Sequence, residues 1–259
     1  MNIIVCIKQV PDTAEIKIDP VTNTLMREGV ESIINPFDLY ALEEALRLKE
    51  RYDGKVTVIS MGPPQVESAL REAVSIGADE IILLSDRKFA GSDTLATSLV
   101  LSKAISKISD FDLVICGQQA IDGDTAQVGP GIAAHLDLPQ VCFIRKIEDI
   151  ENGKITLQRL MDDGYDRLQV NSPAVITVVK EINEPRLPSL RGKRKAKKAE
   201  LIVWNANDLE INEAESGLNG SPTQVVKIFT PEMKSTGEKY EGDPDFLADL
   251  LYNKIKEFK

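Results

Sequence analysis

Short runs of aliphatic and β-branched residues alternate with amphipathic helical stretches over the first two thirds of the chain. Four of these runs are expected to be strands: Ile3–Ile7, Lys55–Ser60, Glu80–Leu84 and Leu113–Cys116. Each is apolar almost throughout, which is typical of parallel strands buried on both faces. The alternation therefore predicts an α/β fold of three layers, with a mainly parallel sheet between two layers of helices.

Four helical stretches connect these strands. The first opens at Asn35-Pro36, where Asn35 suits the cap and Pro36 the first helical position. The second is expected to end at Gly77, and the fourth to begin near Thr125. The apolar stripes of the four helices are Ala41, Leu42, Ala45 and Leu48; Val66, Ala69, Leu70, Ala73 and Val74; Leu101, Ala104, Ile105 and Ile108; and Val128, Ile132, Ala133 and Leu136.

The pattern changes after Pro139. Three segments with turn residues between them predict antiparallel strands that extend the first sheet: Val141–Ile150, Lys154–Met161 and Arg167–Val179. Beyond them we expect a Pro- and Lys-rich loop and then a long, polar C-terminal arm with a helix after Pro244. The predicted division is 1–182 for the α/β domain, 183–198 for a partner-recognition loop and 199–259 for the arm.

Composition excludes several classes of chemistry. The chain of 259 residues has a formal charge of −10, one histidine (His135) and three cysteines that form no CxxC pair. Multi-histidine zinc sites, catalytic triads built on histidine and cysteine-ligated clusters are therefore disfavoured. No apolar run approaches the ~20 residues that span a bilayer, and residues 1–10 lack the features of a secretory signal. We expect a cytoplasmic protein without membrane insertion.

The segment Gly117–Gly131, GQQAIDGDTAQVGPG, is the strongest candidate for a ligand site. Gly117 leaves a strand, Asp122-Gly123-Asp124 makes a turn, and a helix with glycines in its first turns follows. Backbone N–H groups at such a helix start can bind phosphate. Asp124 then caps the helix and Asp122 accepts from a ribose hydroxyl or a base amine. The alternative is a helix capped by Asp124 that binds nothing.

Loops from the neighbouring strand ends add polar groups at the same edge, where parallel α/β sheets bind ligands. These loops are Lys8–Thr13, Ser60–Pro64 and Ser85–Thr97. Thr94, Thr97 and Asn35 are candidates, although each taken singly is more typical of a cap or turn. GxGxxG after the first strand and the P-loop pattern are both absent. We therefore expect a nucleotide-binding chain without catalytic side chains of its own.

A basic run follows the α/β domain. Six of the eight residues Arg191–Lys198 are Lys or Arg. Nucleic acid is the weakest interpretation, because no aromatic residues interleave for stacking and the net charge opposes a polyanion. A docking loop and a solvated turn both remain open. Leu190 either fills a partner's pocket or folds back onto the sheet.

Several motifs recur in one order along the chain: VCIKQVPD, NPF followed by ALEEALRLKE, SMGP, IGAD, GQQAIDGDTAQVGP, SPAVIT and NEPR before the Lys-rich run. Taken together, these motifs resemble the small (beta) subunit of the electron transfer flavoproteins, over nearly the whole chain. The resemblance implies a fold like that of the adenine nucleotide alpha hydrolases. It also implies a heterodimer with an alpha subunit that carries FAD.

By motif, the resemblance implies that the chain binds its own adenine nucleotide at the strand ends already selected. Leu190, with Arg191 beside it, falls where the family anchors a partner dehydrogenase. The implied cofactor-binding residues are Cys6, Asn35, Pro36, Phe37, Asp38, Met61, Thr94, Thr97, Gly117, Asp122, Gly123, Asp124, Thr125, Ala126, Gln127, Val128 and Gly129.

The segments SDRKFAGSDTLATS and DGDTAQVGP resemble the electron-bifurcating type of anaerobic bacteria. That type implies FAD in the beta site, a hydride from NADH, one electron to ferredoxin or flavodoxin, and the other, through the alpha-subunit FAD, to an acyl-CoA dehydrogenase or a similar flavin dehydrogenase. The alternatives are a non-bifurcating subunit that holds structural AMP and a free-standing nucleotide sensor or stress protein. RLMDDGYD, at residues 159–166, departs from the family's usual pattern and bears on partner preference.

Overall fold

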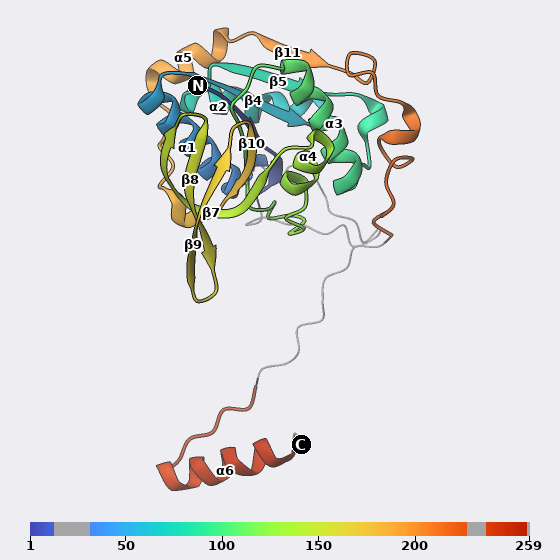
Figure 1. The fold of residues 1–259 in the computed structure, drawn as a ribbon. Coiled ribbons are helices and arrows are strands. Elements are labelled where there is room, and N and C mark those ends of the chain that lie inside the picture. Colours follow the sequence, from blue (N-terminus) through green and yellow to red (C-terminus); the bar gives the residue numbers. More distant parts are fainter. Residues whose placement is uncertain (13–31, 227–236, 258–259) are drawn as a thin grey trace. The chain divides into compact units, whose positions relative to one another are not determined.

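The structure is a computed structural model that describes residues 1–12, 32–226 and 237–257. The chain divides into two compact units, residues 1–226 and 227–259. Thr13, which ends the loop expected after the first strand, lies outside the described residues. The fold class predicted from the alternation is confirmed in the first unit (Figure 1).

A single sheet of nine strands forms the centre of the first unit. Strands from β11 to β7 run parallel, and the β7, β8 and β9 pairings are antiparallel. The order across the sheet is β11 (Leu201–Trp204), β5 (Glu80–Leu84), β4 (Lys55–Met61), β1 (Asn2–Cys6), β6 (Leu113–Gly117), β10 (Ala174–Val178), β7 (Gln140–Glu151), β8 (Lys154–Met161) and β9 (Gly164–Asn171). The expectation that the antiparallel strands extend the parallel sheet is therefore confirmed.

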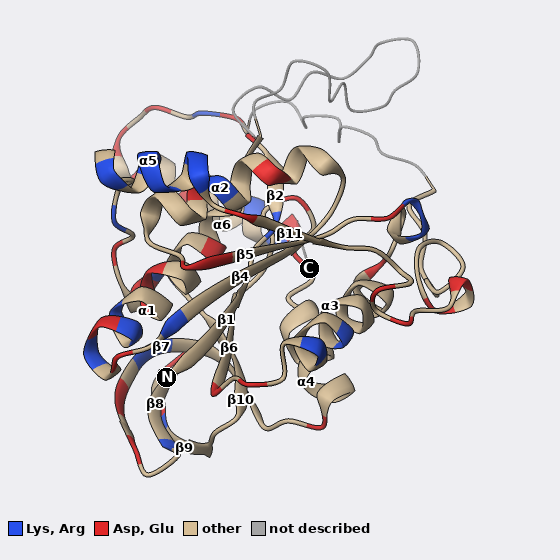
Figure 2. Ribbon diagram, turned by 90° about the horizontal axis from the view of Figure 1, so that it is seen from above, with Lys and Arg blue, Asp and Glu red and all other residues tan. Residues whose placement is uncertain are grey.

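Helices cover both faces of the sheet (Figure 2). One core lies between the sheet and helices α1 (Pro36–Tyr52) and α2 (Glu67–Ile76), and the other lies under α3 (Thr94–Ile108) and α4 (Val128–Leu136). Both cores are built from the aliphatic side chains that alternate along the buried strands. A small second sheet pairs β2 (Gln9–Pro11) with β3 (Ser32–Ile34) beside the end of β1.

The expectation of one strand over Arg167–Val179 is wrong. The segment forms two strands, and β10 leaves the antiparallel hairpin to insert in parallel between β6 and β7. All five residues of β10 are buried, whereas β9 alternates with exposed residues at the sheet edge. The apolar run Ala174–Val178 therefore gains more burial in the middle of the sheet than it would at an edge.

The segment after residue 183 contains more regular structure than expected. Residues 190–198 form helix α5 (Leu190–Lys198) rather than a loop, and β11 adds a parallel strand beside β5. Ala206, Leu209 and Ile211 are buried in the core under α3. Residues 199–226 of the expected arm therefore belong to the first unit, and residues 227–259 form the second.

The second unit contains helix α6 (Pro244–Glu257), so the helix predicted after Pro244 is confirmed. The Asp243 side chain accepts a hydrogen bond from the Phe246 N–H at 3.0 Å and caps the helix. None of the α6 residues that the structure describes is buried, and Phe246, Leu251 and Ile255 are exposed. The helix therefore has no hydrophobic core of its own.

Candidate functional site

The strand order of the sheet reverses at the carboxyl ends of β1 and β6, and we call this edge the crevice. β1 lies between β4 and β6, and the helices that follow β1 and β6 lie on opposite faces of the sheet. Open α/β sheets bind ligands at such a point, outside the carboxyl ends of the strands. The first turn of α1 and the loop of residues 118–127 meet at this crevice, so the motifs selected from the sequence lie together.

Asn35 joins the two sides of the crevice. Its Nδ2 donates to the Gln119 carbonyl at 2.8 Å, and its Oδ1 accepts from the Ile121 N–H at 3.1 Å. Asn35 occupies the cap position of α1, but its side chain makes no capping bond. The expected capping role is therefore wrong, because the buried amide instead holds the loop after β6 in shape.

Asp38 and Gly117 pack against each other beneath this loop. The Asp38 Oδ2 accepts from the Lys8 N–H at 2.7 Å. A Cβ at Gly117 would lie 2.4 Å from Asp38 Oδ1 and 2.8 Å from the Asp38 nitrogen, so a glycine is required there. Burial raises the pKa of Asp38 to about 7, although hydrogen bonds from Lys8, Asn35 and Gly117 act in the opposite direction.

The two aspartates of the turn have partners within the protein. Lys8 Nζ lies 2.5 Å from Asp122 Oδ1, and Gln119 Nε2 donates to Asp124 Oδ1 at 2.8 Å. Asp124 and Ala126 have φ values of 46° and 54°, in the left-handed region that is costly for residues with a side chain. Lys8 thus offsets the charge of Asp122, and the Gln119 amide satisfies one oxygen of Asp124.

Helix α4 begins at Val128, and the expected start near Thr125 is wrong. Asp124 does not cap this helix. Gln127 occupies the cap position, and within the described residues no side chain accepts a hydrogen bond from the first-turn N–H groups of α4. Such N–H groups are available to an anion.

The glycines of α4 serve packing. A Cβ at Gly129 would lie 2.5 Å from Thr177 Cγ2, and one at Gly131 would lie 2.6 Å from Ser98 Oγ. These contacts show that α4 approaches both the sheet and α3 too closely for a larger residue. Gly123 differs, because a Cβ there would meet no heavy atom within 4 Å. Substitution at Gly123 therefore tests the loop surface without disturbing the core.

The remaining selected residues lie around the same edge. Thr94 Oγ1 donates to Gln127 Oε1 at 2.7 Å and joins the start of α3 to the loop, while Asp93 caps α3. Thr97 lies in the first turn of α3. Cys6 and Met61 end β1 and β4, two adjacent strands. A hydrogen bond with Cys116 and burial raise the pKa of the Cys6 thiol well above its usual value.

Two contributors to the site were missed from the sequence. Lys8 and Gln119 each hold one of the turn aspartates. Lys8 lies between β1 and β2, within the motif VCIKQVPD. Its position just after a buried strand was a signal in the sequence for a residue of the site. The role of Gln119 had no local signal, because it depends on the left-handed turn at Asp124.

Leu190 is 83% exposed at the start of α5, so the alternative of a leucine folded onto the sheet is wrong. Arg191 is exposed beside it, and Leu187 is 87% exposed. Figure 2 shows the Lys and Arg residues of α5 beside α2. The predicted docking segment therefore presents two leucines next to a dense positive charge.

A cavity of 380 Å³ lies at the opposite, amino edge of the parallel strands. Asn2, Lys55, Lys107 and Trp204 are among its lining residues. Lys55 Nζ pairs with Glu80 at 2.8 Å, and Lys107 Nζ donates to the Asp208 carbonyl at 2.6 Å. Because its charged groups are already paired, this cavity is a weaker candidate than the crevice.

Comparison with known proteins places the chain in one class, the electron transfer flavoproteins. The sequence model of the electron transfer flavoprotein domain matches residues 22–209. The chain is 57% identical over 244 residues to the electron transfer flavoprotein subunit beta of Thermoanaerobacterium thermosaccharolyticum, covering 94% of this chain and 93% of that one. It is 50% identical over 257 residues to the corresponding subunit of Clostridium acetobutylicum, with 99% and 98% covered.

A third relative is the caffeyl-CoA reductase-Etf complex subunit CarD of Acetobacterium woodii, which is 48% identical over 259 residues, with 99% and 98% covered. The chain belongs to the electron transfer flavoprotein family as a beta-type subunit. The resemblance stated from the motifs is therefore confirmed. Membership implies association with a flavin or nucleotide and with an alpha subunit. Within the described part of the chain, no helix has the length and apolarity to cross a membrane.

Proposed function

We propose that this chain is the beta subunit of a heterodimeric electron transfer flavoprotein and binds FAD in the crevice between β1 and β6. The observation that supports this most is the convergence of Asn35, Asp38 and the loop of residues 118–127 at the direction change of the sheet. Family membership implies a flavin, and we place its nucleotide half at the crevice.

The residues present fit an adenine nucleotide. The uncapped first turn of α4 and the Lys8 ammonium group suit a diphosphate, and the exposed Asp122 carboxylate suits a hydroxyl or amine donor. The Lys8–Asp122 pair is exposed enough for both members to turn toward a ligand. FAD, when bound, supplies the capacity to take up two electrons and release them singly. The protein holds and orients the nucleotide and excludes water at the strand ends.

In the full proposal, NADH is the electron donor and bifurcation sends electrons to ferredoxin or flavodoxin and, through the alpha-subunit FAD, to an acyl-CoA dehydrogenase or a similar flavin dehydrogenase. The segments of bifurcating type and the likeness to a subunit of a caffeyl-CoA reductase complex support this version. We also propose that Leu190 and Arg191 contact the dehydrogenase and that the C-terminal arm contacts the alpha subunit.

The experiment is to co-express the chain with its alpha subunit, denature the purified heterodimer and quantify the released FAD and AMP by chromatography. We expect two FAD and no AMP per heterodimer. One FAD with one AMP would replace the bifurcating version with a one-flavin carrier in which this chain is a nucleotide-stabilised scaffold. One FAD without any second nucleotide would contradict nucleotide binding by this subunit.

Gly123→Val tests the location of the site. The new side chain meets no protein atom within 4 Å of its Cβ, so the fold is retained, but it occupies the surface of the loop where we place the nucleotide. We expect the second nucleotide to fall to well below half occupancy. Gly237→Val, at an equally open position in the second unit, is the matched control and keeps full occupancy. Full occupancy in both variants would move the site away from this loop.

A further inference from the structure

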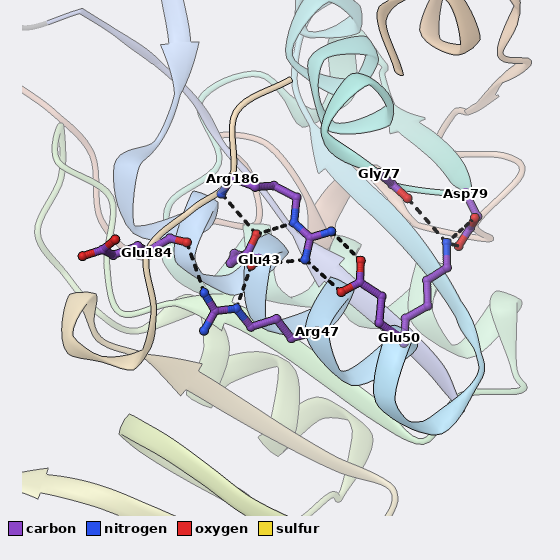
Figure 3. A network of polar contacts seen from close by, with 8 residues as sticks. Glu43, Arg47, Glu50, Gly77, Asp79, Glu184 and Arg186 are labelled. Carbon is purple, nitrogen blue, oxygen red and sulfur yellow. Dashed lines mark hydrogen bonds and ion pairs between the residues drawn. The ribbon is translucent and has the colours of Figure 1, made fainter. Parts of the chain in front are cut away.

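A network of charged groups binds the segment of residues 183–189 to helix α1 (Figure 3). Arg186 is at its centre. Its Nε donates to Glu43 Oε2 at 2.8 Å, its backbone N–H donates to the same oxygen at 3.2 Å, and its Nη2 donates to Glu50 Oε2 at 3.1 Å. One guanidinium group thus bridges two carboxylates of α1, spaced seven residues apart on one face of the helix.

Glu43 is the buried partner in this network, with only 4% of its side chain exposed. Burial would raise the pKa of Glu43, but hydrogen bonds from Arg186 and Arg47 outweigh it and hold the pKa below its usual value. Arg47 also donates to the Glu184 carbonyl at 3.3 Å. A buried carboxylate is costly without hydrogen-bond partners. Burial of Glu43 therefore favours the conformation in which the main chain of residues 184–186 lies against α1.

The same segment is held again three residues later. The Ser189 side chain caps α5 by accepting from the Gly192 N–H at 2.9 Å. The Ser189 N–H donates to the Ser75 carbonyl at the end of α2. The stretch is thus anchored at both ends. Leu187 lies within it and is 87% exposed, and Leu190 directly follows it and is 83% exposed. Two large apolar side chains held in water by a fixed main chain are typical of an interface anchor.

We infer that Arg186 is the positioning residue of the docking segment: its bridge to Glu43 and Glu50 fixes the main chain that presents Leu187 and Leu190 to the partner dehydrogenase. This inference rests on the proposed function. The two leucines and the basic residues of α5 are complementary to an apolar pocket bordered by carboxylates, which we expect on the surface of the partner. The fixed main chain reduces the entropy lost when that pocket closes over the leucines.

The test uses the full heterodimer with flavin and compares four substitutions. Arg186→Gln removes both ion pairs, and Arg186→Lys keeps the charge but loses the planar, bidentate fork of the guanidinium group. Arg51→Gln is the matched control, because Arg51 also lies on α1 and pairs with Asp149, away from the docking segment. Leu190→Ala serves as the reference for lost docking. The readouts are kcat and KM for the dehydrogenase, and hydrogen exchange of residues 187–191.

We expect Arg186→Gln to raise KM for the dehydrogenase about tenfold, with kcat at saturating partner and flavin content unchanged. Arg186→Lys gives a smaller increase, and hydrogen exchange at 187–191 accelerates in the same order. Arg51→Gln changes neither. A wild-type KM in Arg186→Gln, with or without faster exchange, overturns the inference. If Arg186→Gln does not fold, equal KM values for Arg186→Lys and wild type overturn it.

These results separate the inference from the proposed function. If the wild-type heterodimer passes no electrons to any flavin dehydrogenase, the proposed function fails. If the wild type transfers electrons and Leu190→Ala raises KM while both Arg186 variants keep the wild-type KM, only the role of Arg186 fails.

Discussion

Asp38 illustrates how one buried side chain organises the crevice. Its carboxyl group touches the ends of β1 and β6 from the first turn of α1, through Lys8 and Gly117. Removing it would leave the Lys8 N–H without its partner. The residue thus supports the site from beneath the loop, while the Lys8–Asp122 ion pair lies at the protein surface.

Asp38 makes the stability of the protein depend on pH. Its pKa of about 7 in the folded protein is above the value of 3.8 in an unfolded chain, so between these values the folded state keeps a proton that the unfolded state releases. The stability contribution of the protonated group is therefore lost as pH rises from about 4 to 7, by at most about 1.4 kcal/mol per pH unit.

Asp38→Asn removes this dependence. We expect the free energy of unfolding of the wild type to fall relative to that of the variant across this pH range, as measured by urea titration at several pH values. Asp149→Asn, an exposed carboxyl group on β7, is the control and keeps the wild-type slope. Parallel curves for wild type and Asp38→Asn would contradict the buried proton.

At the scale of elements, helix α5 owes its place to helix α2. Six of its nine residues are basic and Ala196 is its one buried residue, so no apolar stripe marks it as a helix. Arg71 of α2 donates to the carbonyls of Ala196 and Ala199 at the end of α5, and Ser189 caps its start. These contacts satisfy backbone groups at both ends of the helix, which helix propensity alone leaves unpaired.

Gly192→Ala tests that packing. A Cβ at residue 192 would lie 1.9 Å from the Ser75 carbonyl oxygen, so the substitution pushes α5 away from α2. Helix propensity alone would make alanine about 1 kcal/mol more favourable, whereas we expect a loss of about 1–3 kcal/mol. Chemical denaturation gives the sign, and hydrogen exchange at 190–198 shows whether α5 is released. Gly123→Ala, where the added Cβ meets nothing, is the control.

At the scale of the whole molecule, the hydrophobic cores lie in the first unit. Both core clusters are formed by residues between Ile3 and Ile211, and helix α6 contributes no buried side chain. A helix with exposed Phe246, Leu251 and Ile255 gains stability when a partner covers these side chains. The division supports the proposal that the C-terminal arm serves association with the alpha subunit.

A chain ending at residue 226 is expected to keep the thermal midpoint of the full-length chain within a few degrees, because it keeps both cores. Co-purification with the alpha subunit should fall sharply. Differential scanning calorimetry and a pull-down with tagged alpha subunit measure the two effects. Substituting Phe246, Leu251 and Ile255 by Ser in the full chain is the matched control for length. Undiminished capture of the alpha subunit by the shortened chain would contradict the role of the arm.

The sequence by itself determined the class of fold and which loops meet at the candidate site. The strands β1, β4, β5 and β6 could be predicted because apolar runs and helical stripes are local patterns, and parallel strands place their following loops at one edge. Tertiary structure alone decided that β10 enters the centre of the sheet, that a lysine-rich segment becomes helix α5, and that Asn35 spans the crevice rather than capping its helix. In each case the deciding contacts join residues far apart in the chain, and no local pattern contains them.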